Sequence, residues 1–254
     1  MSHIAEATLD EVKDFFFRHY APNNAVLAVT GNLSWDETRR LADKWFSSIP
    51  RRDIPKRCLP QESAQTEERR LVVERHVPLD ALYMAFHMCG RDEADYYAFD
   101  ILSDILSNGR SSRLTRRLVL ERKVFSNIDA YISGSRDAGL LNISGRPAAG
   151  VSLEEAEAAV WDELEVLREE LVDFRELEKV KNKFESTQIF GNINYLNVAT
   201  NLAWFELAGE AEDIDREVDR YRAVTSAQLN SVARKAFRRE NVNVLYYKSL
   251  SKQS

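Results

Sequence analysis

Cysteines and long apolar runs are scarce in this sequence. Its 254 residues include only two cysteines, Cys58 and Cys89, and neither belongs to a C-x-x-C pair. This count excludes a disulfide framework and a thiolate zinc cage. No apolar run approaches the roughly 20 residues that span a bilayer, and the first residues lack the charged, apolar and small-residue order of a secretion signal. We therefore predict no membrane span, and the compartment stays open.

An excess of positive charge is also lacking. The formal net charge is -6, whereas nucleic acids and anionic membranes are usually met by a basic surface. We therefore expect no nucleic-acid partner. The 44% of hydrophobic residues and 30% of charged residues are typical of a globular protein with a sizeable core.

The first fifty residues show the pattern of a helix, a strand and a second helix. Thr8 with Glu11 forms a capping box that begins one helix, and Ser34 with Glu37 begins another. The apolar run at 25–29 predicts a short strand between them. Residues 51–70 are polar and aperiodic, which is typical of a linker.

The remaining residues, 71–254, alternate between strands and helices. The stretch that begins at Leu82 is apolar on both faces, so it should form an interior strand. We expect strands at the following apolar positions: Leu71 and Val73, Leu82 to Met88, Ile128 to Ile132, Leu141 and Ile143, and Val242 to Tyr246. We expect helices around these residues: Ile101, Leu118, Leu164, Val180, Phe205, Val218 and Leu229. The order predicts an α+β fold, an antiparallel or mixed sheet with helices packed against it.

The end of the chain repeats its beginning. A shift of 217 residues places Thr8 on Thr225 and Tyr20 on Phe237, each time in a capped helix followed by a turn and a strand. A repeat this long indicates a duplicated domain. Residues 1–50 would then be the closing helix-strand-helix of a preceding domain, 51–70 a linker and 71–254 a second domain. Parted from its own domain, the strand at 25–29 should pack on the second domain or pair with another copy.

Two motifs resemble those of a known family. Residues 15–31, FFFRHYAPNNAVLAVTG, and the WFSSIP that ends at Pro50 resemble the end of the first domain of pitrilysin, insulinase and mitochondrial-processing-peptidase proteins. Residues 105–114, ILSNGRSSRL, are similar to the glycine-containing turn of that family's second domain. The resemblance covers nearly the whole chain.

The resemblance implies a fold and an activity. The family has duplicated α+β domains of the LuxS/MPP-like metallohydrolase fold, which enclose a chamber and cleave extended peptides. Its zinc is held by an H-x-x-E-H helix of the first domain and a later Glu. The four histidines here, His3, His19, His76 and His87, lack that spacing. The zinc site must therefore lie upstream or be absent from the parent protein, and we expect it upstream. We expect no catalytic, metal or cofactor residue in this chain and no activity of the chain alone.

The family's second domain commonly provides an Arg and, seven residues later, a Tyr, which bind the substrate carbonyl. The matching positions here are Val119 and Ser126. Arg122 lies one helical turn from Val119, but we interpret it as an exposed helix arginine. The missing pair leaves open whether the parent protein is active.

Other polar groups suggest ordinary structural roles. We interpret His87 as a satisfied core or interface histidine, and Ser111, Ser112 and the Asn108-Gly109 pair as turn residues. The arginines at 110, 113, 116 and 117 favour a solvated helix face over a docking patch. We expect the same of three groups of acidic residues: Glu154, Glu155 and Glu157; Glu169 and Glu170; and Glu210, Glu212 and Asp213.

These observations leave three functional hypotheses. The first is the carboxy-terminal part of a zinc metalloendopeptidase, which forms the second wall of the peptide chamber. Its partners would be peptide substrate, the upstream catalytic domain and, in the alternative packing above, a second copy. The second hypothesis is a non-catalytic peptide-binding or assembly subunit of the same family. The third is a free-standing interaction domain, which the repeat disfavours.

Overall fold

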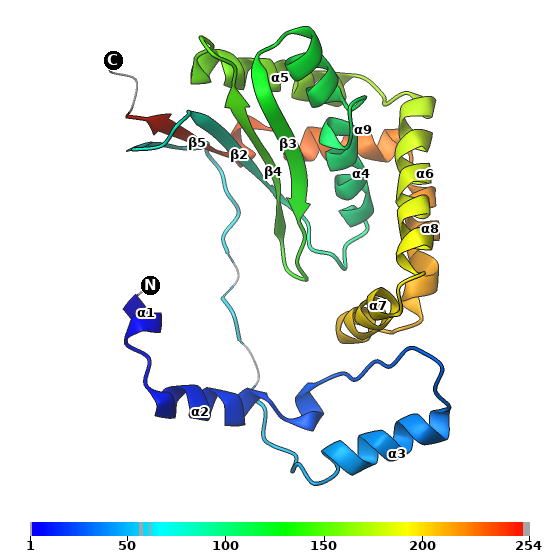
Figure 1. Ribbon diagram of the computed structural model, residues 1–254. Helices are drawn as coiled ribbons and strands as arrows, with labels where there is room; N and C mark the ends of the chain where they lie inside the picture. Colours follow the sequence, from blue (N-terminus) through cyan, green and yellow to red (C-terminus); the bar gives the residue numbers. More distant parts are fainter. Residues whose placement is uncertain (1, 56–57, 61, 251–254) are drawn as a thin grey trace. The chain divides into compact units, whose positions relative to one another are not determined.

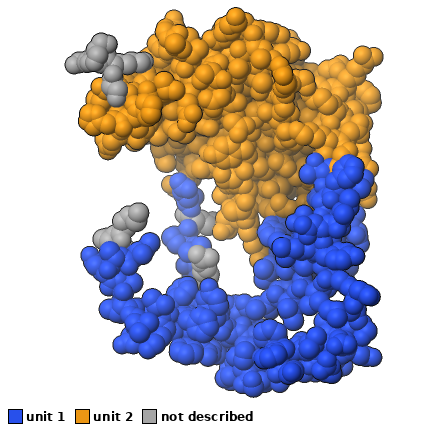
Figure 2. Space-filling view, in the orientation of Figure 1, with its two compact units in different colours: residues 1–62, 187–216 blue, residues 63–186, 217–254 orange. Residues whose placement is uncertain are grey.

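The computed structural model describes residues 2–55, 58–60 and 62–250 (Figure 1). The chain divides into two compact units (Figure 2). The smaller unit comprises Met1–Glu62 and Thr187–Arg216, and the larger comprises Ser63–Ser186 and Glu217–Ser254.

A five-stranded mixed sheet forms the centre of the larger unit. Its strands are β1 (Arg69–Arg75), β2 (Ala81–Met88), β3 (Phe125–Ser133), β4 (Gly139–Pro147) and β5 (Val242–Ser249). Their order is β1-β5-β2-β4-β3, in which β1 pairs with β5 in parallel and the other neighbours are antiparallel. The predicted mixed sheet is confirmed, and β2 is its middle strand, as the two apolar faces of β2 indicate.

Helices cover one face of this sheet. The strands β2 and β3 are contacted by α4 (Tyr96–Ser107), α5 (Leu153–Glu169) and α9 (Ser226–Ala236). The ring of Phe86 on β2 meets Trp161 and Phe237 edge to face, at centroid distances of 5.7 Å and 5.2 Å. Such contacts close the core between the sheet and the helices.

Local sequence signals explain where several elements begin. Ser152 and Glu155 form the predicted capping box of α5. Asp173 accepts a hydrogen bond from the backbone of Arg175 at the start of α6 (Phe174–Gly191). The expected shorter helix around Leu118 is a π-helical segment, η2 (Thr115–Glu121).

Two further helical elements belong wholly or partly to the larger unit. They are α8 (Asp213–Ala223) and η3 (Arg239–Asn241). The α8 helix crosses the boundary between the units, as α6 does. The predicted helix around Val218 is therefore confirmed.

Helices and extended segments make up the smaller unit. Its elements are α1 (Ser2–Ala5), α2 (Leu9–His19), η1 (Pro22–Asn24), α3 (Trp35–Phe46) and α7 (Tyr195–Ala208). The predicted caps are confirmed: Thr8 and Glu11 form a capping box, and Ser34 accepts a hydrogen bond from the backbone of Glu37.

The predicted strand at 25–29 is wrong for this chain. Ala25 is extended, with φ -139° and ψ 148°, but residues 25–30 form no regular element. A strand needs a neighbour to satisfy its backbone groups, and no strand lies beside this segment in the described part of the smaller unit.

Apolar side chains remain largely uncovered in the smaller unit. Among its described residues, only Ala21 and Phe205 are buried apolar side chains. Its exposed large apolar residues include Phe15, Phe16, Tyr20, Leu27, Trp35, Trp45, Phe190, Ile193 and Leu196. Exposed apolar surface of this extent usually marks an interface.

The helices of the described residues fall short of what crossing a bilayer requires. None of them is both long enough and apolar enough.

Candidate functional site

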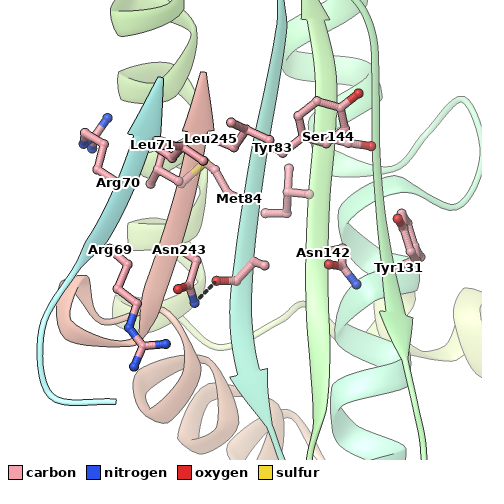
Figure 3. Close-up of a pocket in the computed structure, with 13 residues that line it drawn as sticks. Arg69, Arg70, Leu71, Tyr83, Met84, Tyr131, Asn142, Ser144, Asn243 and Leu245 are labelled. Atoms are coloured by element: carbon pink, nitrogen blue, oxygen red, sulfur yellow. Dashed lines mark hydrogen bonds between the residues drawn. The ribbon is translucent and has the colours of Figure 1, made fainter. Parts of the chain in front are cut away.

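The face of the sheet opposite the helices carries a shallow hollow. Side chains alternate along each strand, so Tyr83, Asn142 and Asn243 stand on the face opposite the buried Met84, Ile143 and Val244. Figure 3 shows the side chains around the hollow, which come from all five strands. The hollow encloses about 370 Å³, a size within the range of small-ligand sites.

A small residue forms the centre of this hollow. Ala85 on β2 pairs in register with Asn142 on β4 and with Asn243 on β5. Because Ala85 has only a methyl group between these two longer side chains, the surface sinks there. The next row across the sheet holds Leu245 and Tyr83, which pair with each other and line one side of the hollow.

The side-chain amides of Asn142 and Asn243, beside the hollow, use only part of their hydrogen-bonding capacity within the chain. Asn142 donates through Nδ2 to the Ser133 hydroxyl at 3.0 Å, and Asn243 donates through Nδ2 to Gln65 Oε1 at 2.9 Å. Within the described part of the chain, no hydrogen bond to the Oδ1 atom of either asparagine is present. Each side chain therefore presents an acceptor.

Gln65 connects the segment before β1 to the start of β5, and it is also the hydrogen-bonding partner of the His87 side chain. Its Nε2 donates to the Val242 carbonyl at 2.9 Å, and its Oε1 lies 3.2 Å from His87 Nε2. His87 is half-buried on β2. The prediction that His87 is a satisfied structural histidine is confirmed.

The positions that match the family's Arg and Tyr do not form a pair that could bind a carbonyl. Val119 lies in η2 and packs against the core. Ser126 lies on β3 and donates to the Arg146 carbonyl at 3.1 Å. Arg122 pairs with Asp162 at 3.1 Å, and both side chains are well exposed, which confirms the interpretation of Arg122 as an exposed arginine.

The arginine cluster is only partly a solvated face. Arg113 is largely buried against Glu176 at 2.7 Å, and Arg117 pairs with the buried Glu163 at 2.9 Å. Burial raises the pKa of Glu163, and the nearby Arg117 opposes this. The prediction of a solvated helix is therefore wrong for Arg113 and Arg117, because acidic groups of α6 and α5 draw them inward.

The turn around Asn108 and Gly109 has the predicted structural role. Gly109 has φ +103°, a conformation that favours glycine. The Ser112 hydroxyl is buried and donates to the Gly109 carbonyl at 2.6 Å. Lys179 donates to the Ser111 hydroxyl at 3.1 Å, so both serines serve the turn.

One of the acidic residues expected on a solvated face is buried. Glu157 on α5 is 5% exposed. It receives two hydrogen bonds from Arg70 on β1, at 2.7 Å and 2.9 Å, one from the Tyr246 hydroxyl at 2.6 Å and one from Trp161 Nε1 at 3.2 Å. The prediction is wrong for Glu157, because two of the partners that satisfy it, Arg70 and Tyr246, lie 87 and 89 positions away in the sequence.

The hydrogen bonds at Glu157 also decide its ionisation. Burial acts to raise the pKa of this carboxyl, but the hydrogen bonds from Arg70, Tyr246 and Trp161 outweigh it and lower the pKa overall. Burial and the same carboxylate raise the pKa of Tyr246 to about 12. Glu157 therefore stays ionised and ties β1 and β5 to α5.

Metal-binding residues are not gathered in the described ranges. No group of three or more His, Cys, Asp or Glu side chains is placed there to hold a metal ion. Cys58 is exposed and Cys89 is half-buried, and burial raises the pKa of the Cys89 thiol to about 11. A thiol with so high a pKa is a poor metal ligand at neutral pH.

Sequence reasoning missed the hollow. The alternation in β2 predicts which residues share its second face, but it does not predict that Asn142 and Asn243 flank Ala85, because that depends on the register of three strands. The one signal available was a small residue between two large ones, Tyr83 and His87, on the same face.

The chain belongs to a peptidase family. Residues 6–184 match the family model described as the Peptidase M16 inactive domain. The chain thus belongs to the pitrilysin and insulinase family of zinc peptidases, and the model that it matches describes the family's inactive domain. This confirms the family and the non-catalytic role predicted from the sequence.

Curated relatives are zinc proteases. The chain is 21% identical over 229 residues to the uncharacterized zinc protease YmxG of Bacillus subtilis, covering 90% of this chain and 55% of the relative. It is 25% identical over 186 residues to the zinc protease PqqE of Helicobacter pylori, covering 71% of this chain and 41% of the relative. The chain thus spans about half the length of the curated relatives it matches.

Solved structures share the fold. A protease from Helicobacter pylori has a TM-score of 0.91 at 22% identity, covering 98% of this chain and 60% of that one. A peptidase M16 inactive domain from Pseudomonas fluorescens has a TM-score of 0.83 at 18% identity, covering 98% of this chain and 59% of that one.

Proposed function

We propose that this chain is the carboxy-terminal, non-metal part of a zinc metalloendopeptidase and that it forms the second wall of the peptide-binding chamber. Membership in the inactive-domain family supports the role, and the curated relatives that it half covers are named as zinc proteases. Zinc would be held by an upstream domain of the parent protein, because the described residues offer no ligand set for it.

The observation that carries this proposal is a structural repeat at the 217-residue offset. The helix α2 (Leu9–His19) corresponds residue for residue to α9 (Ser226–Ala236), and η1 (Pro22–Asn24) corresponds to η3 (Arg239–Asn241). Equivalent hydrogen bonds recur: Asn24 Nδ2 donates to the His19 carbonyl at 2.8 Å, and Asn241 Nδ2 donates to the Ala236 carbonyl at 2.9 Å.

The two copies of the repeated helix differ in how far their apolar side chains are exposed. Leu229, Val232 and Phe237 are each 0% exposed, whereas the equivalent Val12, Phe15 and Tyr20 are 56%, 58% and 63% exposed. The second copy leads into β5, which is paired on both sides. The first leads into residues 25–29, which are unpaired.

This contrast supports a preceding domain with its own sheet. Residues 1–50 would close that domain, with α2 packed on the sheet and 25–29 added as a strand. Residues 51–70 would be the linker, and 71–254 the second domain. This chain would then contribute chamber surface and peptide contacts, and an outermost strand of its sheet, β1 or β3, would pair with an extended substrate.

Metal analysis and peptide hydrolysis test the proposal. Both are measured on this chain alone and after mixing with the upstream part of the parent protein. We expect no bound zinc and no cleavage with the chain alone, and cleavage that a chelator abolishes in the mixture. Stoichiometric zinc or cleavage with the chain alone would contradict the proposal.

A second function is favoured by Val119 and Ser126. Because the residues that bind the substrate carbonyl in active relatives are missing at these positions, the parent could be a non-catalytic peptide-binding or assembly subunit. Inert mixtures that still bind peptide would favour this alternative. An upstream H-x-x-E-H helix with a later Glu would favour the peptidase.

A further inference from the structure

We propose that the hollow over Ala85 is a subsite that holds a large apolar side chain of an extended, acidic peptide. The inference rests on the proposed function, and it names the substrate class that this wall of the chamber would select. Neither Val119 nor Ser126, the positions that match the family's carbonyl-binding residues, is among the residues that line the hollow.

The shape and lining of the hollow suit an aliphatic or aromatic side chain. Ala85 forms the floor, and Leu71, Leu245 and Tyr83 stand in one row beside it. Leu71 is 59% exposed and Tyr83 is 45% exposed. These side chains would lose water contact if a leucine or phenylalanine filled the hollow, which favours binding.

The polar groups around the floor suit a peptide backbone. Asn142 and Asn243 flank Ala85 on the two neighbouring strands, and their Oδ1 atoms are acceptors for N–H groups. An extended peptide exposes N–H groups on both sides of each apolar residue. A hollow that buries one side chain and has one acceptor on each side therefore matches an extended peptide better than a compact apolar ligand.

The charge of this face selects the peptide further. Strand alternation and register place Arg69, Arg75 and Arg146 on it, and none of the residues that line the hollow is acidic. The same register places the carboxylate of Asp129 on this face, where it accepts a hydrogen bond from the Ser107 hydroxyl at 2.6 Å, so the three arginines outnumber it. This basic face in a chain of net charge -6 favours carboxylates in the bound peptide.

Peptide binding to this chain, followed by fluorescence anisotropy, tests the inference. The probe is a labelled extended peptide that carries one leucine among alanines and two aspartates. Replacement of that leucine by alanine should weaken binding about tenfold or more, because a buried leucine is lost from the hollow. Replacement of the aspartates by lysines should weaken binding as well.

The matched variants are Ala85→Leu and Ala138→Leu. Ala85→Leu fills the hollow and should weaken binding of the leucine peptide to the level of the alanine peptide. Ala138→Leu makes the same change at an exposed position of the turn between β3 and β4, so it should leave binding unchanged. Circular dichroism establishes that both variants are folded.

Several results would overturn the inference. They are equal binding of the leucine and alanine peptides, equal binding of the aspartate and lysine peptides, full binding by Ala85→Leu, and no binding of any peptide. Self-association that Ala85→Leu abolishes would assign the hollow to a second copy instead. Hydrolysis by the mixed parts is a separate measurement, so a failure of the subsite is distinguishable from a failure of the proposed peptidase.

Discussion

The carboxylate of Glu157 connects three elements of the larger unit. It accepts hydrogen bonds from Arg70 of β1, Tyr246 of β5 and Trp161 of its own helix. Arg239 adds a longer ion pair at 3.5 Å and lies over the Trp161 ring. Because β1 is an edge strand, this cluster helps to hold it in the sheet.

Glu157→Ala should therefore lower the free energy of unfolding by about 2–3 kcal/mol, since it leaves Arg70 and Tyr246 without their buried acceptor. Urea denaturation followed by circular dichroism measures the change. Glu169→Ala, at an exposed position of the same helix, is the matched control and should change stability by no more than about 0.5 kcal/mol. Equal effects of the two substitutions would contradict the role assigned to Glu157.

The contribution of Glu157 to the free energy of unfolding should depend on pH. Its pKa in the folded protein is lower than that of an ordinary glutamate, so its contribution is fully present above the unfolded-state pKa and is lost as pH falls through the folded-state value. The stability difference between the unmodified chain and Glu157→Gln should be constant near neutral pH and shrink in acid. Denaturation curves at neutral pH and below pH 4 compare the two. A difference that grows in acid would contradict the lowered pKa.

Residue-level predictions succeeded where the signal was local. The turn roles of Ser112 and Gly109 and the cap at Ser152 follow from neighbouring residues. The partners of Arg113 and Glu157 could not be predicted, because Glu176 and Arg70 lie 63 and 87 positions away in the sequence and an amphipathic pattern does not identify which charges turn inward.

At the scale of elements, helices were predictable and strand pairing was not. Capping boxes and helical spacing identify α2, α3, α5 and α9 from short windows of sequence. The parallel pairing of β1 with β5 joins residues from opposite ends of the domain, so only the mixed character of the sheet could be expected. The segment 25–29 was expected as a strand, but its pairing partner is not available in the smaller unit.

The repeated helices α2 and α9 provide a matched pair of substitutions. Phe237→Ala removes a side chain that is 0% exposed and should lower the free energy of unfolding by about 3–5 kcal/mol. Tyr20→Ala changes the equivalent residue, which is 63% exposed, and should have an effect within about 0.5 kcal/mol in this chain alone.

The Tyr20→Ala substitution also tests whether a preceding domain covers α2. When the upstream part of the parent protein is present, Tyr20→Ala should weaken its association with this chain, because Tyr20 becomes buried as Phe237 is. Sedimentation velocity on the mixture measures the association. Unchanged association of Tyr20→Ala with the upstream part would contradict the equivalence of the two helices, and so would a large destabilisation by Tyr20→Ala in the chain alone.

At the scale of the whole molecule, the sequence predicted the family, the fold class and the non-catalytic role, because these depend on motifs and on the repeat. It did not predict the hollow over Ala85, which depends on the register of β2, β4 and β5. The division into a closing segment, a linker and a second domain stays a prediction.

Hydrogen exchange along α2 tests the central claim most directly. The claim is that residues 1–50 close a preceding peptidase domain, and α9 provides the internal reference for a covered copy of the same helix. Amide exchange in α2 and at 25–29 is compared between this chain alone and its mixture with the upstream part of the parent protein. The account predicts fast exchange in the chain alone and protection approaching that of α9 and β5 in the mixture. Exchange that stays fast in the mixture, or α2 protection equal to that of α9 in the chain alone, would contradict it.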